Sequence, residues 1–86
     1  MPQHSLHQVE EEVIHIIAQL CKREATEIAK YQSLANDLAV DSIQFLELLS
    51  TLEEHFGFEM EVDDLQPERF RSVQSVIHFV LGKTGE

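Results

Sequence analysis

The sequence predicts an all-α fold: a small four-helix bundle with three main helices, one short helix and a long first loop. Three segments repeat apolar residues at spacings of three and four, which is the period of an amphipathic helix. No segment shows the strict alternation of apolar and polar residues that is typical of a half-buried strand. The chain has 86 residues, of which 43% are hydrophobic. That length and composition predict one domain, residues 1–86, with one modest core.

The first helix is expected at about residues 5–23. Ser5 followed by Gln8 has the spacing of a capping box, in which two side chains satisfy free backbone N–H groups of the first turn. The apolar stripe that we expect to face the core comprises Leu6, Val9, Val13, Ile16, Ile17 and Leu20.

The second helix is expected at residues 42–56. Asp41 is a favourable N-cap, and Gln44, three residues later, completes a capping box. Gly57 is placed to end the helix in the left-handed conformation. The core-facing stripe comprises Phe45, Leu48, Leu49, Leu52 and Phe56.

The last two helices are expected at residues 67–70 and 72–81. Pro67 suits the first position of the short helix. Ser72 is the expected N-cap of the longer helix and Gly82 its C-terminal cap. Its inward residues are Val73, Val76, Ile77 and Val80.

Residues 24–40 form a long connection with little periodicity. A loop of this length in a compact domain is usually functional or anchored. Ile28, Leu34 and Leu38 recur along it, and we expect them to anchor it in the core.

The charge of the chain excludes two classes of partner. Sixteen acidic and six basic residues give a net charge of −10. Such a surface repels phosphate backbones and anionic membranes, so neither nucleic acid nor membrane is an expected partner. Between Asp37 and Glu68 there are ten acidic residues and no Lys or Arg. This distribution favours either a solvated acidic face or a basic protein partner.

Cysteine and histidine usage indicates neither a disulfide framework nor a metal site. Cys21 is the only cysteine, which together with the absence of a signal-peptide pattern predicts a reducing, cytoplasmic location. Cys21 itself is either a reactive thiol near basic residues or a small apolar residue at the edge of the first helix. His4 and His7 have helical spacing, but no further ligand completes a tetrahedral set.

The second helix has another face besides its core stripe. Two apolar side chains ringed by carboxylates suit a docking surface, with apolar contact in the middle and charge at the rim. The alternative is that Leu46 only widens the core stripe. The residues of this face are Ile43, Leu46, Glu47, Ser50, Glu53 and Glu54.

Ser42 lies in the first turn of the second helix, next to Asp41. Unpaired N–H groups and the positive end of the helix dipole favour a phosphate ester at this position. Serine is also common at helix N-termini for capping alone, so the dipeptide by itself does not decide between the two interpretations.

The surrounding sequence resembles the acyl carrier protein family, in which an Asp-Ser-Leu or Asp-Ser-Ile tripeptide opens the second helix of a four-helix bundle. The resemblance extends from about the first helix to Leu81. The matching segments are Ser33-Leu34, Asp37-Leu38-Ala39-Val40-Asp41-Ser42-Ile43, Glu47-Leu48, Leu52-Glu53-Glu54-His55-Phe56-Gly57 and Phe70-Arg71-Ser72-Val73 with Ile77.

The resemblance implies that Ser42 carries 4′-phosphopantetheine taken from coenzyme A, with Asp41 read by a phosphopantetheinyl transferase. The protein is then a carrier and not an enzyme, and it presents acyl groups as thioesters to partner enzymes with basic surfaces. The second face of the second helix matches the family's docking positions, and a monomer is expected. Phe45, Leu48 and Leu49 are implied to line or block a cavity for the acyl chain.

Three departures from the family pattern favour a dedicated pathway over housekeeping fatty acid synthesis. Ala39 stands where the family usually has glycine, and Gln44 stands where many fatty acid carriers have an acid. The segment around Pro67 is more similar to carriers of specialised pathways. The cargo stays open between fatty acyl, polyketide, and aminoacyl or peptidyl groups. An alternative from a different class is an unmodified acidic helical adaptor for a basic partner. Under that alternative, the similarity of the sequence around Ser42 to the family is a coincidence.

Overall fold

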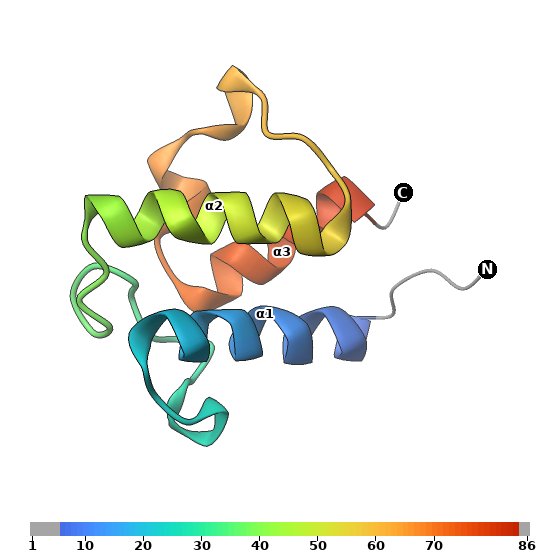
Figure 1. Cartoon of the computed structure of the whole chain (residues 1–86). Coiled ribbons are helices and arrows are strands. Elements are labelled where there is room, and N and C mark those ends of the chain that lie inside the picture. The colour runs from blue at the N-terminus through green and yellow to red at the C-terminus, as the bar shows by residue number, and fades with distance from the viewer. Residues whose placement is uncertain (1–5, 85–86) are drawn as a thin grey trace.

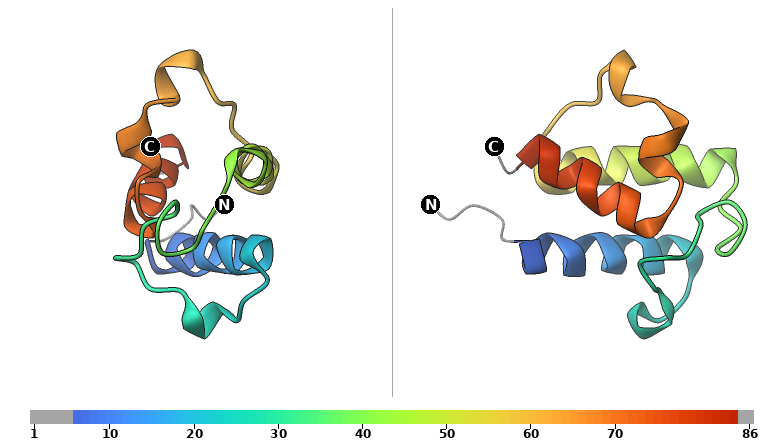
Figure 2. Two further views of the ribbon diagram at one scale, coloured as in Figure 1. Left: turned by 90° about the vertical axis from the view of Figure 1, so that its left-hand side faces the viewer. Right: turned by 180° about the vertical axis from the view of Figure 1, so that it is seen from behind.

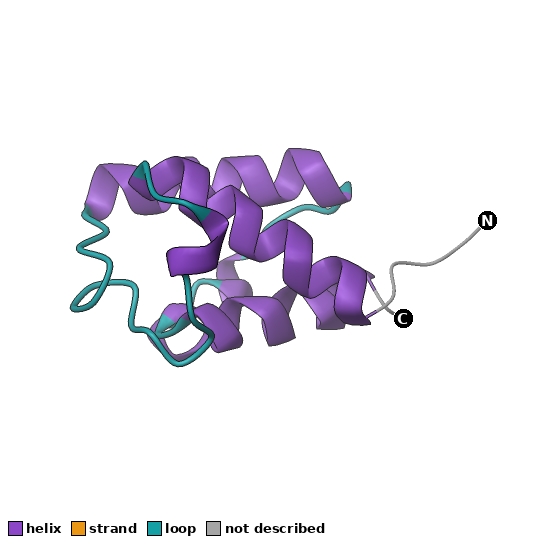
Figure 3. Ribbon diagram, turned by 90° about the horizontal axis from the view of Figure 1, so that it is seen from below, coloured by secondary structure: helices purple, strands orange, loops and turns teal. Residues whose placement is uncertain are grey.

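The structure is a computed structural model that describes residues 6–84, apart from the side chain of Pro67. Three α-helices, α1 (Leu6–Cys21), α2 (Ser42–Phe56) and α3 (Val73–Thr84), are joined by loops that carry 3₁₀ turns (Figure 1). The turns are η1 (Ala25–Glu27), η2 (Val62–Asp64) and η3 (Pro67–Phe70). Residues 6–84 contain no strand, only an isolated bridge between Ser33 and Ser72 (Figure 3). The predicted all-α class is confirmed.

The three helices surround one core. α1 runs antiparallel to α2 and underlies both α2 and α3, while the segment between α2 and η3 arches away on the opposite side (Figure 2). The loop anchors Ile28, Leu34 and Leu38 are buried as predicted. The core residues are Val9, Val13, Ile16, Ile17, Ala18, Ile28, Leu34, Leu38, Leu48, Leu49, Leu52, Phe56, Phe70, Val73, Val76, Ile77, Phe79 and Val80.

α1 ends two residues before the predicted boundary. Lys22 adopts the left-handed conformation (φ 58°). The N–H of Arg23 then donates to the carbonyl of Ala18 at 2.9 Å, which closes the helix as in a Schellman motif. Leu6 is 56% exposed because it lies in the first turn, before the buried stripe begins at Val9, so its assignment to the core is wrong. Ser5 lies outside the described residues.

α2 has the predicted bounds and both predicted caps. The Asp41 carboxylate accepts the Gln44 N–H at 2.8 Å, and the Gln44 side-chain oxygen accepts the Asp41 N–H at 3.3 Å. Gly57 ends the helix with φ 73°, where a side chain would be strained. The two caps fix Ser42 as the first helical residue.

α3 begins as predicted but continues past its predicted end at residue 81. The Ser72 hydroxyl accepts the Ser75 N–H at 3.1 Å and caps the helix. Gly82 is helical and is not a cap. Two side-chain contacts hold this last turn: Thr84 Oγ1 donates to the Val80 carbonyl at 2.9 Å, and Lys83 Nζ donates to Asp64 at 2.8 Å.

An aromatic cluster joins η3 to α2 and α3, and of its members the predicted core contains Phe45 alone. The ring of Phe70 lies 5.2 Å from that of Phe45 and 5.1 Å from that of Phe79. Phe58 packs against Phe79 at 5.9 Å. Such pairs add about 0.5–1.5 kcal/mol each to the free energy of area burial. The cluster therefore fixes η3 beside the first turns of α2.

The first loop is tied to the junction between η3 and α3. Leu34 N–H donates to the Arg71 carbonyl at 3.1 Å, and Val73 N–H donates to the Gln32 carbonyl at 3.0 Å. A third bond runs from Gln74 N–H to the Lys30 carbonyl at 2.9 Å. These bonds bring the loop and η3 together at the N-terminal end of α2.

Ala39 adopts the left-handed conformation, with φ 55°. A Cβ atom in this region costs about 1–2 kcal/mol. Glycine removes that strain but loses about 0.4–1 kcal/mol more conformational entropy on folding. We therefore expect Ala39→Gly to stabilise the protein by about 0.5–1 kcal/mol, which thermal unfolding detects as a rise of several degrees in Tm.

The matched control for this change is Ala35→Gly, because Ala35 is also exposed and in the first loop but has no positive φ. It is expected to lower Tm, since only the entropic cost remains. Equal effects of the two substitutions contradict the assignment of strain to Ala39.

The ion pair between Asp64 and Lys83 connects η2 to the last turn of α3, with both side chains mostly covered. The hydrogen bond from Lys83, followed by that from the Glu61 N–H, holds the pKa of the Asp64 carboxyl below its ordinary value. The hydrogen bond to Asp64 raises the pKa of Lys83. The Asp64 contribution to stability is present above the ordinary carboxyl pKa and is lost as pH falls through the lowered pKa. The Lys83 contribution is lost as pH rises through the raised pKa.

Asp64→Asn is therefore expected to lower Tm at pH 7, and the difference from wild type should shrink as pH falls through the lowered pKa of the Asp64 carboxyl. Asp63→Asn is the control, because Asp63 is the exposed neighbour and forms no ion pair within residues 6–84. Thermal unfolding followed by circular dichroism across this pH range gives the measurement. A deficit that persists at acid pH, or is equal in both variants, contradicts the role of this pair.

Candidate functional site

Ser42 presents an exposed hydroxyl at the N-terminus of α2. The capping box uses the N–H groups of Asp41 and Gln44. Within residues 6–84, the N–H groups of Ser42 and Ile43 form no hydrogen bond. Together with the helix dipole, these two donors favour a negatively charged group on the Ser42 oxygen.

The other described serines differ from Ser42 in their surroundings. The hydroxyls of Ser33 and Ser72 accept backbone N–H groups at 2.8 Å and 3.1 Å, and Ser75 pairs with Ser72 at 3.1 Å. Ser50 is exposed but lies in the middle of α2, away from the free N–H groups of the helix end. Ser42 thus combines an unengaged hydroxyl with an anion-favouring position.

A pocket of about 670 Å³ adjoins Ser42. The first loop, the first turns of α2 and the η2–η3 segment form its walls, and Phe45 and Phe70 supply aromatic surface. Leu48 and Leu49, implied as cavity residues together with Phe45, do not line this pocket. The lining residues are Ser33, Leu34, Ala35, Asn36, Val40, Asp41, Ser42, Phe45, Leu65, Gln66, Phe70 and Arg71.

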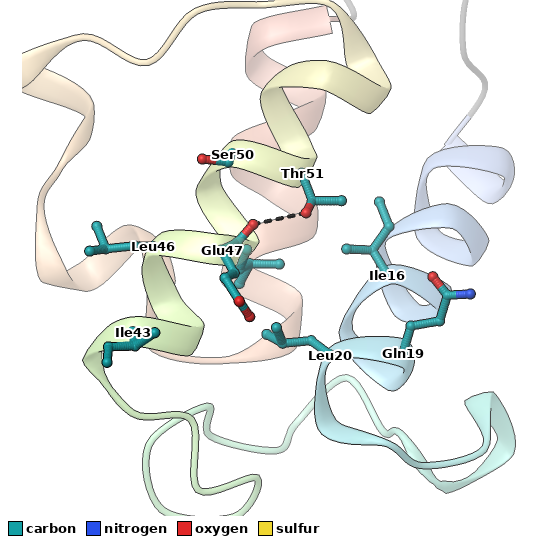
Figure 4. Close-up of a pocket in the computed structure, with 9 residues that line it drawn as sticks. Ile16, Gln19, Leu20, Ile43, Leu46, Glu47, Ser50 and Thr51 are labelled. Carbon is teal, nitrogen blue, oxygen red and sulfur yellow. Dashed lines mark hydrogen bonds between the residues drawn. The ribbon is translucent and has the colours of Figure 1, made fainter.

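The second face of α2 is open to solvent. Ile43 is 71% exposed and Leu46 is 62% exposed, so the interpretation of Leu46 as a core residue is wrong. Figure 4 shows Ile43, Leu46 and Ser50 on the left of α2, while Glu47 and Thr51 lie on the side nearer to α1. Glu47 and Glu54 are also exposed. Two large apolar side chains are thus exposed to solvent near Ser42, between acidic groups: Ile43 is the next residue and Leu46 follows one turn later.

Glu53 does not share this open position. It is half-buried, and its carboxylate accepts the Met60 N–H at 2.6 Å. The side chain therefore holds the segment that follows α2. The helical spacing in the sequence places Glu53 beside Glu54, but it does not show the returning loop.

A second hollow, of about 590 Å³, lies between α1 and α2 (Figure 4). Ile16, Gln19 and Leu20 line it from α1, facing Glu47 and Thr51 of α2. It meets the exposed α2 face at Ile43 and Leu46, which also contribute to its lining.

Gln44 is directed away from the exposed face of α2. It is half-buried, and its amide nitrogen lies 3.5 Å from the Leu20 carbonyl at the end of α1. An acid at this position can accept the Asp41 N–H but cannot donate to that carbonyl. Gln44 therefore connects the start of α2 to α1.

Cys21 behaves as an apolar residue of the helix edge. It packs against the core, and its sulfur lies 4.0 Å from the Leu38 carbonyl. Burial raises the pKa of its thiol, an effect that the charge of Arg23 partly offsets. A raised pKa lowers the thiolate fraction at neutral pH, which opposes the reactive-thiol interpretation.

Two of the histidines pair with glutamates. His7 lies 3.0 Å from Glu11 along α1, and His55 lies 3.0 Å from Glu12 across the α1–α2 interface. Residues 6–84 contain no cluster of three or more side chains suited to holding a metal ion. His4 lies outside the described residues.

Known proteins match most of the length of this chain. The family described as "Phosphopantetheine attachment site" matches residues 11–80. An acyl carrier protein of Clostridium acetobutylicum is 38% identical over 76 residues, which cover 88% of this chain and 96% of that protein. One of Chlamydia felis is 36% identical over 78 residues, covering 91% and 97%. This chain belongs to the acyl carrier protein family.

Members of this family are carriers and not catalysts, and their prosthetic group is 4′-phosphopantetheine. The family interacts with a phosphopantetheinyl transferase and with enzymes that handle acyl groups. The residues present fit the prosthetic group, because an exposed hydroxyl, free N–H groups and a pocket meet at the start of α2.

A solved structure shows the same fold. The solution structure of the apo doublet acyl carrier protein from prodigiosin biosynthesis matches with a TM-score of 0.76 and 24% identity. The match covers 91% of this chain and 37% of the doublet, so the chain spans little more than a third of that protein. None of the helices in the described part of the chain has the length and hydropathy to cross a bilayer.

Proposed function

We propose that Ser42 is the residue to which 4′-phosphopantetheine is attached. The observation that carries this proposal is the position of Ser42: its hydroxyl is exposed at the first residue of α2, beside two N–H groups without partners in residues 6–84. The family match includes this position. Asp41 supports the site by capping α2, which holds Ser42 in the first turn.

The attachment joins the Ser42 oxygen to the phosphorus of phosphopantetheine. Coenzyme A is the donor, the hydroxyl proton is lost, and the nucleotide half of coenzyme A leaves as adenosine 3′,5′-bisphosphate. The transferase supplies the catalytic groups, so this chain needs no general base beside Ser42. The bound group supplies a thiol on which acyl groups are carried as thioesters.

Incubation with coenzyme A and a broad-specificity phosphopantetheinyl transferase, followed by intact mass spectrometry, tests this function. A gain of one phosphopantetheine supports a carrier. If several transferases leave the mass unchanged while modifying a control carrier, the protein is an unmodified acidic adaptor.

The exposed face of α2 is proposed as the docking surface for basic partner enzymes. Ile43 and Leu46 provide apolar contact, and Glu47 and Glu54 provide charge at the rim. Ser50 lies on the same side of the helix. Glu53 lies next to Glu54 in the helix, but its carboxylate accepts the Met60 N–H. We therefore expect Glu53 to contribute less to docking than Glu47 and Glu54 do.

The carried groups are proposed to be acyl intermediates of a dedicated pathway, polyketide or related, instead of housekeeping fatty acid synthesis. The support is the departure from the family pattern at Ala39 and around Pro67. Loading trials on the modified protein distinguish the cargoes. Efficient exchange with fatty acid synthesis enzymes contradicts this choice, and loading only by an adenylating enzyme indicates an aminoacyl or peptidyl carrier.

We further propose that the chain works as one monomeric domain in the cytoplasm. A carrier thiol has to stay reduced, which favours a reducing compartment. The net charge of −10 opposes self-association, since two copies of the acidic face repel each other.

A further inference from the structure

The pocket beside Ser42 contains one basic side chain, that of Arg71. Arg71 is exposed and forms no ion pair within residues 6–84. Three other basic side chains are engaged: Lys30 with Glu10, Lys83 with Asp64, and Arg69 over the ring of Phe79. Lys22 and Arg23 follow α1 and do not line this pocket. Arg71 is therefore the basic group available to an anion at Ser42.

The backbone of Arg71 is held close to the first loop. Its carbonyl accepts the Leu34 N–H at 3.1 Å, and the next residue, Ser72, forms the bridge with Ser33. Leu34 and Ser33 line the same pocket as Ser42. The position of Arg71 relative to the attachment site is thus set by main-chain bonds, while its side chain keeps its rotamer freedom.

A negatively charged group on Ser42 needs the positive charge of Arg71, because the rest of its surroundings is acidic. From Asp37 to Glu68 the chain has no Lys or Arg. Asp41 also lines the pocket, although its carboxylate is already bonded to the Gln44 N–H at 2.8 Å. A guanidinium presents several N–H donors in a geometry that suits phosphate oxygens.

From these observations we infer that Arg71 binds the phosphodiester of the phosphopantetheine arm and draws the first part of the arm into the pocket. The branched apolar part of the arm next to the phosphate then contacts Phe45 and the half-exposed Leu65, both in the lining. This inference rests on the proposed attachment at Ser42.

Nuclear magnetic resonance of the modified protein tests the inference. The phosphorus resonance of the arm is compared between wild type, Arg71→Gln and Arg69→Gln. The Nε resonance of Arg71 is compared between wild type and Arg69→Gln, with and without the arm. Arg69→Gln is the matched control. It removes the same charge at a position two residues before Arg71, and the Arg69 side chain lies over the ring of Phe79, outside the pocket. Intact mass and peptide mapping first verify one arm on Ser42 in each sample.

In wild type we expect the Arg71 Nε resonance to shift when the arm is added. The phosphorus resonance should move toward that of free phosphopantetheine in Arg71→Gln and stay in place in Arg69→Gln. About 1 M salt should weaken the wild-type effect, since the Debye length is then only about 3 Å and exposed charges farther apart are screened. An arm on Ser42 without these shifts contradicts the inference alone. If the Arg71 Nε resonance shifts only after the arm is loaded with a malonyl group, and not with an acetyl group, Arg71 binds the carboxylate of the cargo. That result overturns the inference. A protein without an arm on Ser42 contradicts the proposed function and this inference together.

Discussion

Replacing Ser42 with alanine is expected to abolish the addition of phosphopantetheine. The change removes the oxygen that forms the phosphodiester. No other residue in the first turn of α2 has a hydroxyl group. The fold should remain, because the Ser42 side chain forms no hydrogen bond within the described chain and Asp41 keeps the cap. Intact mass spectrometry after the transferase reaction measures the loss, which should be complete.

Ser50→Ala is the control for this experiment. Ser50 is the other exposed serine of α2 and also presents an unengaged hydroxyl, but it lies in mid-helix. We expect the same final gain of mass as in wild type, because Ser50 lies on the docking surface but does not carry the arm. Circular dichroism should show the same helix content and a similar Tm for all three proteins. Retained modification of Ser42→Ala places the attachment elsewhere.

Truncating Leu46 to alanine is expected to slow the reaction with the transferase, and with any acyl-handling partner, by about tenfold or more. Leu46 is 62% exposed in the free protein, so the change costs little stability. Burial of a leucine side chain in an interface contributes about 1.5–3 kcal/mol. The fall should be seen in kcat/KM at limiting carrier concentration, measured by the rate of adduct formation.

Val62→Ala provides the comparison, because Val62 is a strongly exposed apolar residue of η2 that lies outside the docking surface. It should leave kcat/KM unchanged. Glu47→Lys should also reduce kcat/KM, with a larger effect at low salt, since charge at the rim acts mainly on association. Unchanged rates for both Leu46→Ala and Glu47→Lys show that the partner binds another surface.

The sequence predicts α2 better than the other helices because its ends are specified locally. Asp41, Gln44 and Gly57 each act within a few residues, and the structure shows all three in the expected roles. The prediction that Gly82 caps the last helix is wrong because α3 continues to Thr84. One of the contacts that hold this last turn is with Asp64, which is distant in the sequence and which helical spacing does not show. Helical spacing does not predict the short turns η1 and η2, because each is a single turn. Their first N–H groups, those of Glu24 and Glu61, donate to the side chains of Glu27 and Asp64.

At the site, helical spacing correctly separates the exposed Ile43 and Leu46 from the core stripe. It does not reveal that Glu53 is bonded to Met60, because that contact depends on how the following loop returns. The pocket beside Ser42 is also invisible in the sequence. Its walls come from three separate segments, and Arg71 reaches it only through the bonds between the first loop and the start of α3.

Locating the adduct on the wild-type chain tests whether Ser42 is the attachment residue. Fragmentation of the modified peptide in a tandem mass spectrometer identifies the residue that carries the phosphopantetheine. We expect a single adduct on Ser42. An adduct on Ser33, Ser50 or any other residue, or no adduct under conditions that modify a known carrier, contradicts attachment at Ser42.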